Sequence, residues 1–222
     1  SLTFVYGYEF KAGLKKIRSL TSKPIGLNAL IEASNQKYID RQKKFIDEAL
    51  EEGVKFFITS LGNPKWVVER VASAGGIVFH DVTEKKWAAK AVDAGVHGLI
   101  CVNNRAGGHA GTLSPEKLVE DLSAFNLPLV CAGGIGSKEE YKKVLNLGYS
   151  AVQMGTRFIA TKECAADEKY KKAILDAHES DIVLTRKLTG VPVSVINNDY
   201  VKKIGTEAGP IAKYLLSHPR AK

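Results

Sequence analysis

The sequence predicts an α/β fold and, within that class, a parallel (βα)8 barrel of the TIM type. Short apolar runs with strand character alternate with amphipathic helical segments along most of the 222 residues, which is typical of a parallel sheet with helical crossovers. The runs lack a polar face, as strands buried on both sides do. The phrases EEGVKFF, DAGVHGLI and NLGYSAVQM repeat one device, in which a helix ends at glycine just before a strand. This repetition favours a closed barrel, and an open doubly wound sheet is the alternative.

Seven strands are expected before residue 158, each short and mostly apolar. Their ranges are Thr3–Gly7, Pro24–Leu30, Phe56–Ser60, Gly76–Val82, Gly98–Asn103, Pro128–Ala132 and Ala151–Gly155. A closed barrel of this type needs an eighth strand. We expect that strand to precede Ser1, because the chain opens on a strand-like pattern and does not begin with methionine.

Six helices are expected beside these strands, each with apolar residues recurring on one face. Their ranges are Phe10–Leu20, Gln36–Glu52, Pro64–Ala74, Glu84–Ala94, Pro115–Phe125 and Ser137–Leu147. Two helices have clear start signals. Ser114 is an N-cap followed by Pro115, and Ser137 forms a capping-box pattern with Glu140.

The pattern changes after Arg157, so we expect two parts. Residues 1–157 form the barrel, and residues 158–222 form a mainly helical segment that packs on or near the barrel mouth. The helices expected in this second part are Glu168–Ser180, Lys187–Ile196 and Ala208–Ser217.

Charge and composition limit the classes of function. The net charge is +8 and 45% of the residues are hydrophobic, as in ordinary globular proteins. The basic residues form no block with interleaved aromatic residues, so nucleic-acid binding is not favoured. No apolar run approaches the ~20 residues of a membrane span, and no secretory signal opens the chain. The three cysteines lack metal-type spacing and are expected to be reduced thiols in a cytoplasmic protein.

Two loops that carry glycine predict a phosphate site. In a βα barrel, functional groups gather at the carboxyl ends of the strands. AGGIGS leads from one such end into a capped helix, and MGTRF follows the next strand. Glycines let backbone N–H groups converge on an anion near a helix N-terminus. Gly133, Gly134, Gly155 and Thr156 are the candidate phosphate ligands, and the alternative is that these glycines only form tight turns.

His109 is the candidate catalytic base. It lies in the loop NNRAGGHAG after an apolar strand, where barrel loops carry chemistry. An imidazole with a pKa near ~6.5 accepts a proton at neutral pH. The alternative is a histidine that only bonds its own loop. We interpret His80, which lies within an apolar strand, as a core histidine or one that supports the site from behind.

These motifs resemble those of the nitronate monooxygenase family, formerly called 2-nitropropane dioxygenases. The matching stretches are PIGLNAL, GIVFHDVTEKKWAAKAVDAGVHGLI, AGGHAGTLSP, LVCAGGIGS and AVQMGTRFIATKEC, in the family's order over nearly all of the chain. The resemblance implies a barrel that holds FMN non-covalently, so residues 1–157 are expected to be the FMN-binding part.

The resemblance also implies roles for single residues. The four candidate ligands would hold the FMN phosphate, with Gln153 and Met154 alongside. Asn28 would contact the flavin ring system or its chain, Gly108 would let the ring approach, and His109 would be the base beside the flavin. The substrate would be a nitronate or nitroalkane, oxidised with O2 to a carbonyl compound and nitrite. Asp81 departs from the many relatives that carry lysine near this position.

Two other functions stay open from the sequence. One is an NAD(P)H-dependent flavin reductase of the same barrel type, resembling enoyl-acyl-carrier-protein reductase II or a quinone reductase, in which His109 donates a proton. The other is a non-catalytic barrel that binds a phosphorylated small molecule. We expect no nucleic-acid partner, no membrane partner and no metal, and a homodimer is one option for the assembly.

Overall fold

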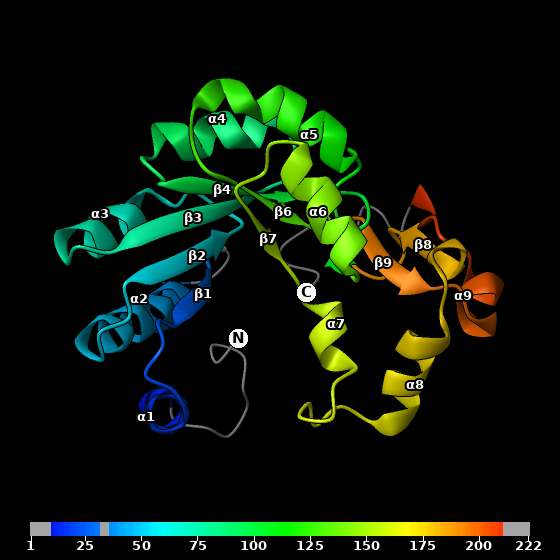
Figure 1. Ribbon diagram of the computed structural model, residues 1–222, viewed down its shortest axis with the longest axis horizontal. Helices are drawn as coiled ribbons and strands as arrows, with labels where there is room; N and C mark the ends of the chain where they lie inside the picture. The colour runs from blue at the N-terminus through cyan, green and yellow to red at the C-terminus, as the bar shows by residue number, and fades with distance from the viewer. Residues whose placement is uncertain (1–9, 32–35, 211–222) are drawn as a thin grey trace. The chain divides into compact units, whose positions relative to one another are not determined.

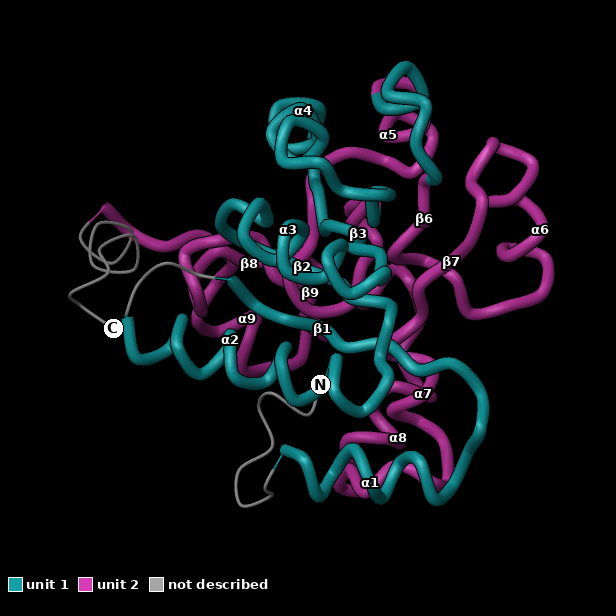
Figure 2. Tube along the Cα trace, turned by 90° about the vertical axis from the view of Figure 1, so that its left-hand side faces the viewer, with its two compact units in different colours: residues 1–100, 122–128 teal, residues 101–121, 129–222 magenta. Residues whose placement is uncertain are grey.

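The computed structural model of the protein describes residues 10–31 and 36–210 (Figure 1). These residues divide into two compact units, shown in different colours in Figure 2. Unit 1 comprises residues 1–100 and 122–128, and unit 2 comprises residues 101–121 and 129–222. The expected strand 3–7 lies outside the described residues, as does most of the expected helix 208–217.

Unit 1 is a regular alternation of helices and parallel strands. Its elements in chain order are α1 (Phe10–Leu20), β1 (Gly26–Leu30), α2 (Gln36–Glu51), β2 (Phe56–Ser60), α3 (Lys65–Ser73), β3 (Ile77–Val82), α4 (Lys85–Asp93), the first three residues of β4 (Gly98–Val102) and the 3₁₀ helix η2 (Ser123–Phe125). The parallel register places Leu27 opposite Phe57, and Phe57 opposite Val78. All three side chains are buried. The predicted βα alternation is therefore confirmed in this unit.

The helices end where the sequence predicts. Gly53, Gly95 and Gly148 each follow a helix, with φ values of 77°, 83° and 108°. This left-handed conformation is open to glycine at little cost and turns the chain sharply toward the next strand. The repeated glycine before a strand is thus a helix stop, as its position in the three phrases indicates.

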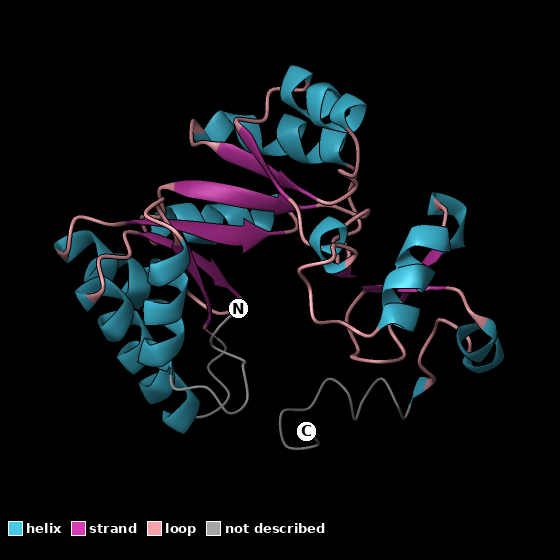
Figure 3. Cartoon of the chain, turned by 60° about the horizontal axis from the view of Figure 1, so that its bottom comes forward, coloured by secondary structure: helices cyan, strands magenta, loops and turns pink. Residues whose placement is uncertain are grey.

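Unit 2 continues the parallel sheet and adds a second, antiparallel sheet. Its elements are the end of β4, β5 (Gly108–His109), α5 (Pro115–Leu122, whose last residue belongs to unit 1), β6 (Leu129–Ala132), α6 (Lys138–Asn146), β7 (Ala151–Gln153), α7 (Thr156–Ile159), α8 (Glu168–Asp176), the 3₁₀ helix η3 (Glu179–Asp181), β8 (Ile182–Thr185), β9 (Val193–Ile196) and α9 (Asp199–Ile204). The parallel strands follow the order β1-β2-β3-β4-β6-β7, and the antiparallel strands follow β5-β9-β8. Figure 3 shows the strands in magenta and the helices in cyan.

The predicted helix 187–196 is wrong, because the structure has β9 at Val193–Ile196. The stretch GVPVSVI is rich in β-branched residues, which favour strands. It also contains proline and glycine, which disfavour a helix interior. β9 pairs with β8 and with β5, so the described part of residues 158–222 contains strands as well as helices. The proposed boundary at residue 157 stays a prediction.

Among the described residues, none of the helices combines the length and the apolar character that crossing a membrane requires.

Candidate functional site

The loops that follow β4, β6 and β7 meet within unit 2. Parallel strands have their carboxyl ends at one edge of a sheet, and Ala132 at the end of β6 pairs with Gln153 at the end of β7. A Cβ on Gly133 would lie 2.5 Å from the backbone nitrogen of Ala106. A Cβ on Gly107 would clash with the Oγ1 of Thr156. The loop after β4 therefore packs closely against the loops after β6 and β7.

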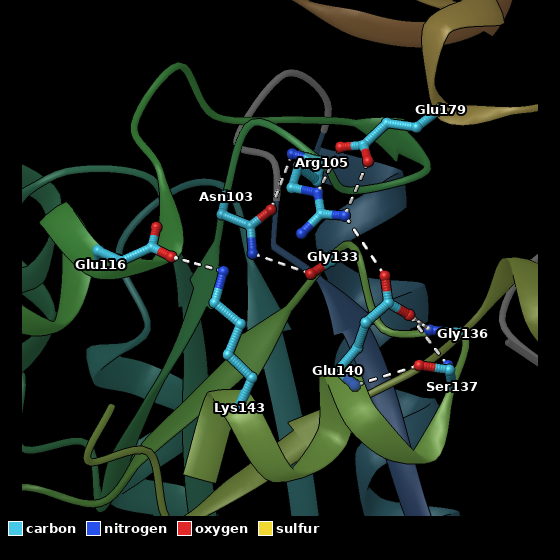
Figure 4. Close-up of polar contacts among 9 residues, drawn as sticks. All are labelled: Asn103, Arg105, Glu116, Gly133, Gly136, Ser137, Glu140, Lys143 and Glu179. Carbon is cyan, nitrogen blue, oxygen red and sulfur yellow. Dashed lines mark hydrogen bonds and ion pairs between the residues drawn. The ribbon is translucent and has the colours of Figure 1, made fainter. Parts of the chain in front are cut away.

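Asn103 joins the histidine loop to the glycine turn after β6 (Figure 4). Its side chain is fully buried. Its Oδ1 accepts from the backbone N–H of Arg105 at 2.8 Å. Its Nδ2 donates to the carbonyl of Gly133 at 3.0 Å. The backbone carbonyl of Asn103 also accepts from the N–H groups of Ala106 and Gly111, each at 3.2 Å. One residue thus fixes both turns at once.

The other side of the histidine loop is held by β9. Gly108 lies opposite Ser194 and His109 lies opposite Val193 in the antiparallel register. The N–H of Ala110 donates to the carbonyl of Pro192 at 3.1 Å. Both Gly108 and His109 are exposed, so the imidazole is open to a ligand while its backbone is fixed.

The turns after β6 and β7 are the candidate anion cradle. Gly133 and Gly134 have φ values of 120° and 72°, which residues with a Cβ rarely adopt. Helix α7 starts at Thr156, and its N-cap residue Gly155 provides no side-chain cap. The first N–H groups of a helix have no partner within the helix. These groups and the Thr156 hydroxyl are donors of the kind that a phosphate needs, so the residue types present are compatible with an anionic ligand.

Gln153 and Met154 lie directly before this cradle. Gln153 ends β7 and is half-buried, and Met154 is 39% exposed. The contact of these two side chains with a ligand stays a prediction.

The N-terminus of α6 already holds an anion of its own chain. The carboxylate of Glu140 accepts from the N–H groups of Gly136 at 2.7 Å and Ser137 at 2.9 Å. The Ser137 hydroxyl accepts from the Glu140 N–H, which completes the predicted capping box. The Gly136 bond, with help from Ser137 and the Arg105 charge, keeps the pKa of Glu140 below its usual value. Gly136 is consequently a helix-capping position, and phosphate donors are expected at the neighbouring glycines.

Arg105 lies beside the cradle and pairs with two carboxylates. Its Nη2 is 3.4 Å from Glu140 Oε1, and its Nε is 2.8 Å from Glu179 Oε1. A Cβ on Gly134 would lie 2.9 Å from the Arg105 Nε. The side chain therefore covers this glycine, with its positive charge balanced by Glu140 and Glu179 (Figure 4).

Three further polar residues lie on strands of unit 1. Asn28 is the half-buried middle residue of β1, and its predicted flavin contact stays a prediction. His80 is buried on β3, its Nδ1 lies 2.8 Å from Thr59 Oγ1, and desolvation lowers its pKa to about 4. This confirms the interpretation of His80 as a buried histidine. On the same strand, burial raises the pKa of Asp81 to about 7, and its Oδ1 has no hydrogen-bond partner among the described residues.

Sequence reasoning missed the roles of Asn103 and Ser194. Asn103 had a signal, since it directly follows a buried strand at the end where function gathers. Ser194 had no such signal, because its segment was interpreted as a helix.

Within the described ranges, no group of three or more His, Cys, Asp and Glu side chains could hold a metal ion.

A family model described as nitronate monooxygenase matches residues 7–222. The chain belongs to the nitronate monooxygenase family. The members of this family are flavin-dependent oxidoreductases. The match agrees with the convergence of the glycine loops and the histidine loop in unit 2.

Curated relatives carry two kinds of name. A protein of Rhodococcus jostii (strain RHA1), named (3aS,4S,5R,7aS)-5-hydroxy-7a-methyl-1-oxo-octahydro-1H-indene-4-carboxyl-CoA dehydrogenase, is 29% identical over 205 residues, covering 92% of this chain and 56% of the relative. A probable nitronate monooxygenase of Staphylococcus saprophyticus is 30% identical over 185 residues, covering 78% of this chain and 52% of the relative. The chain thus spans about half the length of the curated relatives it matches.

Solved structures share the fold. FabK from Thermotoga maritima aligns with a TM-score of 0.78 and 28% identity over 90% of this chain and 63% of its own. A nitroalkane oxidase from Streptomyces ansochromogenes aligns with a TM-score of 0.78 and 24% identity over 97% of this chain and 76% of its own. The first likeness extends to sequence, and the second is one of fold alone.

Proposed function

We propose that the protein is an FMN-dependent oxidoreductase on a (βα)8 barrel, which removes a proton from a carbon acid and oxidises the resulting carbanion. The observation that carries the proposal is the convergence of two glycine turns, at residues 133–134 and 155–156, with the loop of His109. The two glycine turns are suited to a phosphate, and the loop of His109 is suited to proton transfer. Together they suit a mononucleotide whose ring lies beside an imidazole.

In the proposed complex, Gly133, Gly134, Gly155 and Thr156 hold the FMN phosphate through backbone N–H groups and one hydroxyl. Such charge-assisted bonds are stronger than bonds between neutral groups. Gln153 and Met154 flank the cradle. Asn28 is proposed as a further flavin contact on the family resemblance alone.

His109 provides the base. Bound FMN would supply a two-electron acceptor that O2 regenerates. His109 removes the proton on the carbon next to an electron-withdrawing group and holds it on the imidazole. Its side chain is exposed while its backbone is paired with β9, so the imidazole can be reached by a substrate while the main chain of His109 is held in place. Gly108 has no side chain to obstruct a planar ring.

A nitroalkane or its nitronate is the first substrate class that we propose, with a carbonyl compound and nitrite as products. The family membership and the relative from Staphylococcus saprophyticus support it. The net charge of +8 also favours the approach of an anionic nitronate.

A second candidate is a dehydrogenase or reductase that acts on an acyl thioester. The relative from Rhodococcus jostii, named for its action on a carboxyl-CoA compound, is as similar in sequence as the monooxygenases are. The carbon next to a thioester carbonyl is also acidic, so His109 would remove a proton from it in a dehydrogenase and donate a proton to it in a reductase. NAD(P)H would reduce the flavin in a reductase of this kind.

Anaerobic flavin reduction distinguishes the two candidates. The purified protein is first examined for flavin absorbance and, if colourless, reconstituted with FMN. Bleaching of the flavin by nitronate alone supports the monooxygenase. Bleaching by NADH or NADPH alone, followed by reoxidation with an α,β-unsaturated acyl thioester, supports the reductase. A protein that cannot be loaded with FMN contradicts both and indicates a non-catalytic binding protein.

A further inference from the structure

The loop that carries His109 needs anchors from outside itself. Residues 105–111 include Gly107, Gly108 and Gly111, and glycine gives a backbone more conformational freedom than any other residue. A catalytic base must nevertheless be held within ~0.5 Å of its working position. Glu140 and Glu179 bond to the side chain of Arg105, whereas the side chains of Asn103 and Ser194 bond to the backbone of this loop.

Ser194 bonds to the histidine loop from strand β9. Its hydroxyl donates to the carbonyl of Ala106 at 2.6 Å. Ser194 lies opposite Gly108 in the antiparallel pair, and Ala106 lies two residues before Gly108 in the chain. Gly108 has no Cβ, and the serine side chain can therefore reach across it to the carbonyl of Ala106.

The bond from Ser194 to Ala106 holds the start of the histidine loop, which lies beside the glycine turn after β6. Ala106 N–H is already held by the carbonyl of Asn103, and the same nitrogen lies against Gly133. Three residues further along, His109 is paired with Val193 of the same strand β9. Ser194 thus holds the start of the loop to the strand that also holds the histidine.

We propose that Ser194 is a positioning residue, which fixes the backbone of residues 105–111 and thereby orients His109. The proposal rests on the proposed function as far as catalysis is concerned. The ordering of the loop is a property of this chain alone and can be measured without turnover.

Hydrogen exchange tests the ordering directly. In the protein with FMN added, Ser194→Ala is expected to speed exchange of the Ala110 and Gly111 amides three- to tenfold, because one hydrogen bond of ordinary strength is lost. The Ser150 amide, which bonds to Leu129 between β6 and β7, is the internal reference and should change less than twofold. Ser194→Thr keeps the hydroxyl and should restore slow exchange.

Thr189→Ala is the matched control. Thr189 donates its hydroxyl to the carbonyl of Val191 at 3.1 Å, so the variant also loses a hydroxyl-to-carbonyl bond before β9 but none to the histidine loop. Exchange at Ala110 should stay as in the wild type. Equal exchange in Ser194→Ala and Thr189→Ala overturns the proposal, and so does an equal acceleration at Ser150, which would show a general loss of stability.

Kinetics test the consequence for His109. Ser194→Ala is expected to lower kcat for a neutral nitroalkane three- to tenfold with KM within twofold, while preformed nitronate, which needs no base, reacts as in the wild type. An equal loss of kcat with both substrates, or no loss with either, overturns the proposal that Ser194 supports catalysis by His109. If the wild type oxidises neither substrate, the proposed function fails, and the exchange result alone decides whether Ser194 positions the loop.

Discussion

His109 is held through its backbone, by pairing with Val193 and by the neighbouring bond from Ala110 to Pro192. The imidazole can therefore be removed without breaking the hydrogen bonds that order the loop. His109→Ala should keep FMN bound and lower the turnover of neutral nitroalkane roughly 10²- to 10⁴-fold, the usual contribution of a general base. Stopped-flow flavin reduction with nitroalkane and with preformed nitronate is the measurement. Unchanged nitroalkane turnover would refute the role of His109.

Asp81 makes stability depend on pH. Burial raises its pKa from 3.8 to about 7, so the folded state binds more protons than the unfolded state between these values, and stability falls as pH rises through this window. Asp81→Asn removes the buried charge and should raise the free energy of unfolding by roughly 2–4 kcal/mol at pH 8, with little effect at pH 4. Urea unfolding of both proteins across this range is the measurement.

His80 titrates in the same range with the opposite sign. Its pKa is lowered to about 4, so the unfolded state binds more protons between this value and the ordinary one, and stability falls as pH drops. Because His80 is present in both proteins, its effect cancels in their difference. A difference between Asp81→Asn and the wild type that does not vary with pH would show that Asp81 has an ordinary pKa.

At this scale the sequence indicates candidate site residues, whose roles stay predictions, but it does not indicate how their loops are anchored. Gly133, Gly134 and Thr156 could be proposed because glycine and hydroxyl residues after a strand have a direct physical reason. The bonds from Asn103 to Gly133 and from Ser194 to Ala106 join residues far apart in the chain. Such contacts depend on tertiary packing, which local patterns do not contain.

At the scale of elements, the capping box of α6 separates helix stability from ligand binding. The Ser137 hydroxyl accepts from Glu140 N–H at 3.1 Å, and the N–H of Ser137 itself is bound by the Glu140 carboxylate. Ser137→Ala should lower the free energy of unfolding by about 1 kcal/mol and leave FMN affinity within twofold. Ser73→Ala, which loses an exposed bond at a helix end, should change stability by less than ~0.5 kcal/mol. A tenfold loss of FMN affinity in Ser137→Ala would place the phosphate at α6.

Elements with a strong period were predictable, including α8 within the predicted helix 168–180, whereas the short strands β5, β8 and β9 were not. Helices α1 to α6 and strands β1 to β4, β6 and β7 appear close to their predicted ranges. β5 has two residues and exists only through its pairing with β9. A strand this short has no local signal, because its hydrogen bonds come from a segment that lies far along the chain.

For the whole molecule, the account predicts that FMN stabilises the fold. A ligand that binds only the folded state adds about 2.7 kcal/mol at a concentration of 100 Kd. For a chain of 222 residues, this corresponds to a rise in Tm of roughly 5–10 °C. Differential scanning calorimetry with increasing FMN is the measurement, and a Tm independent of FMN would contradict flavin binding.

The α/β class and the parallel strand order could be expected from periodicity, because buried strands and amphipathic helices each have a distinct pattern. Closure of the sheet into a barrel stays a prediction. The site could be expected as a set of loops at one edge of the sheet, and Gly133 and Thr156 do lie against the histidine loop.

The central claim is that backbone amides at residues 133–134 and 155–156 hold the phosphate of a flavin mononucleotide. Comparing FMN with riboflavin tests it most directly, because the two ligands differ only in that phosphate. Isothermal titration calorimetry should show FMN binding about 100-fold more tightly than riboflavin, as expected for several charge-assisted hydrogen bonds. Equal affinities for FMN and riboflavin would contradict the account.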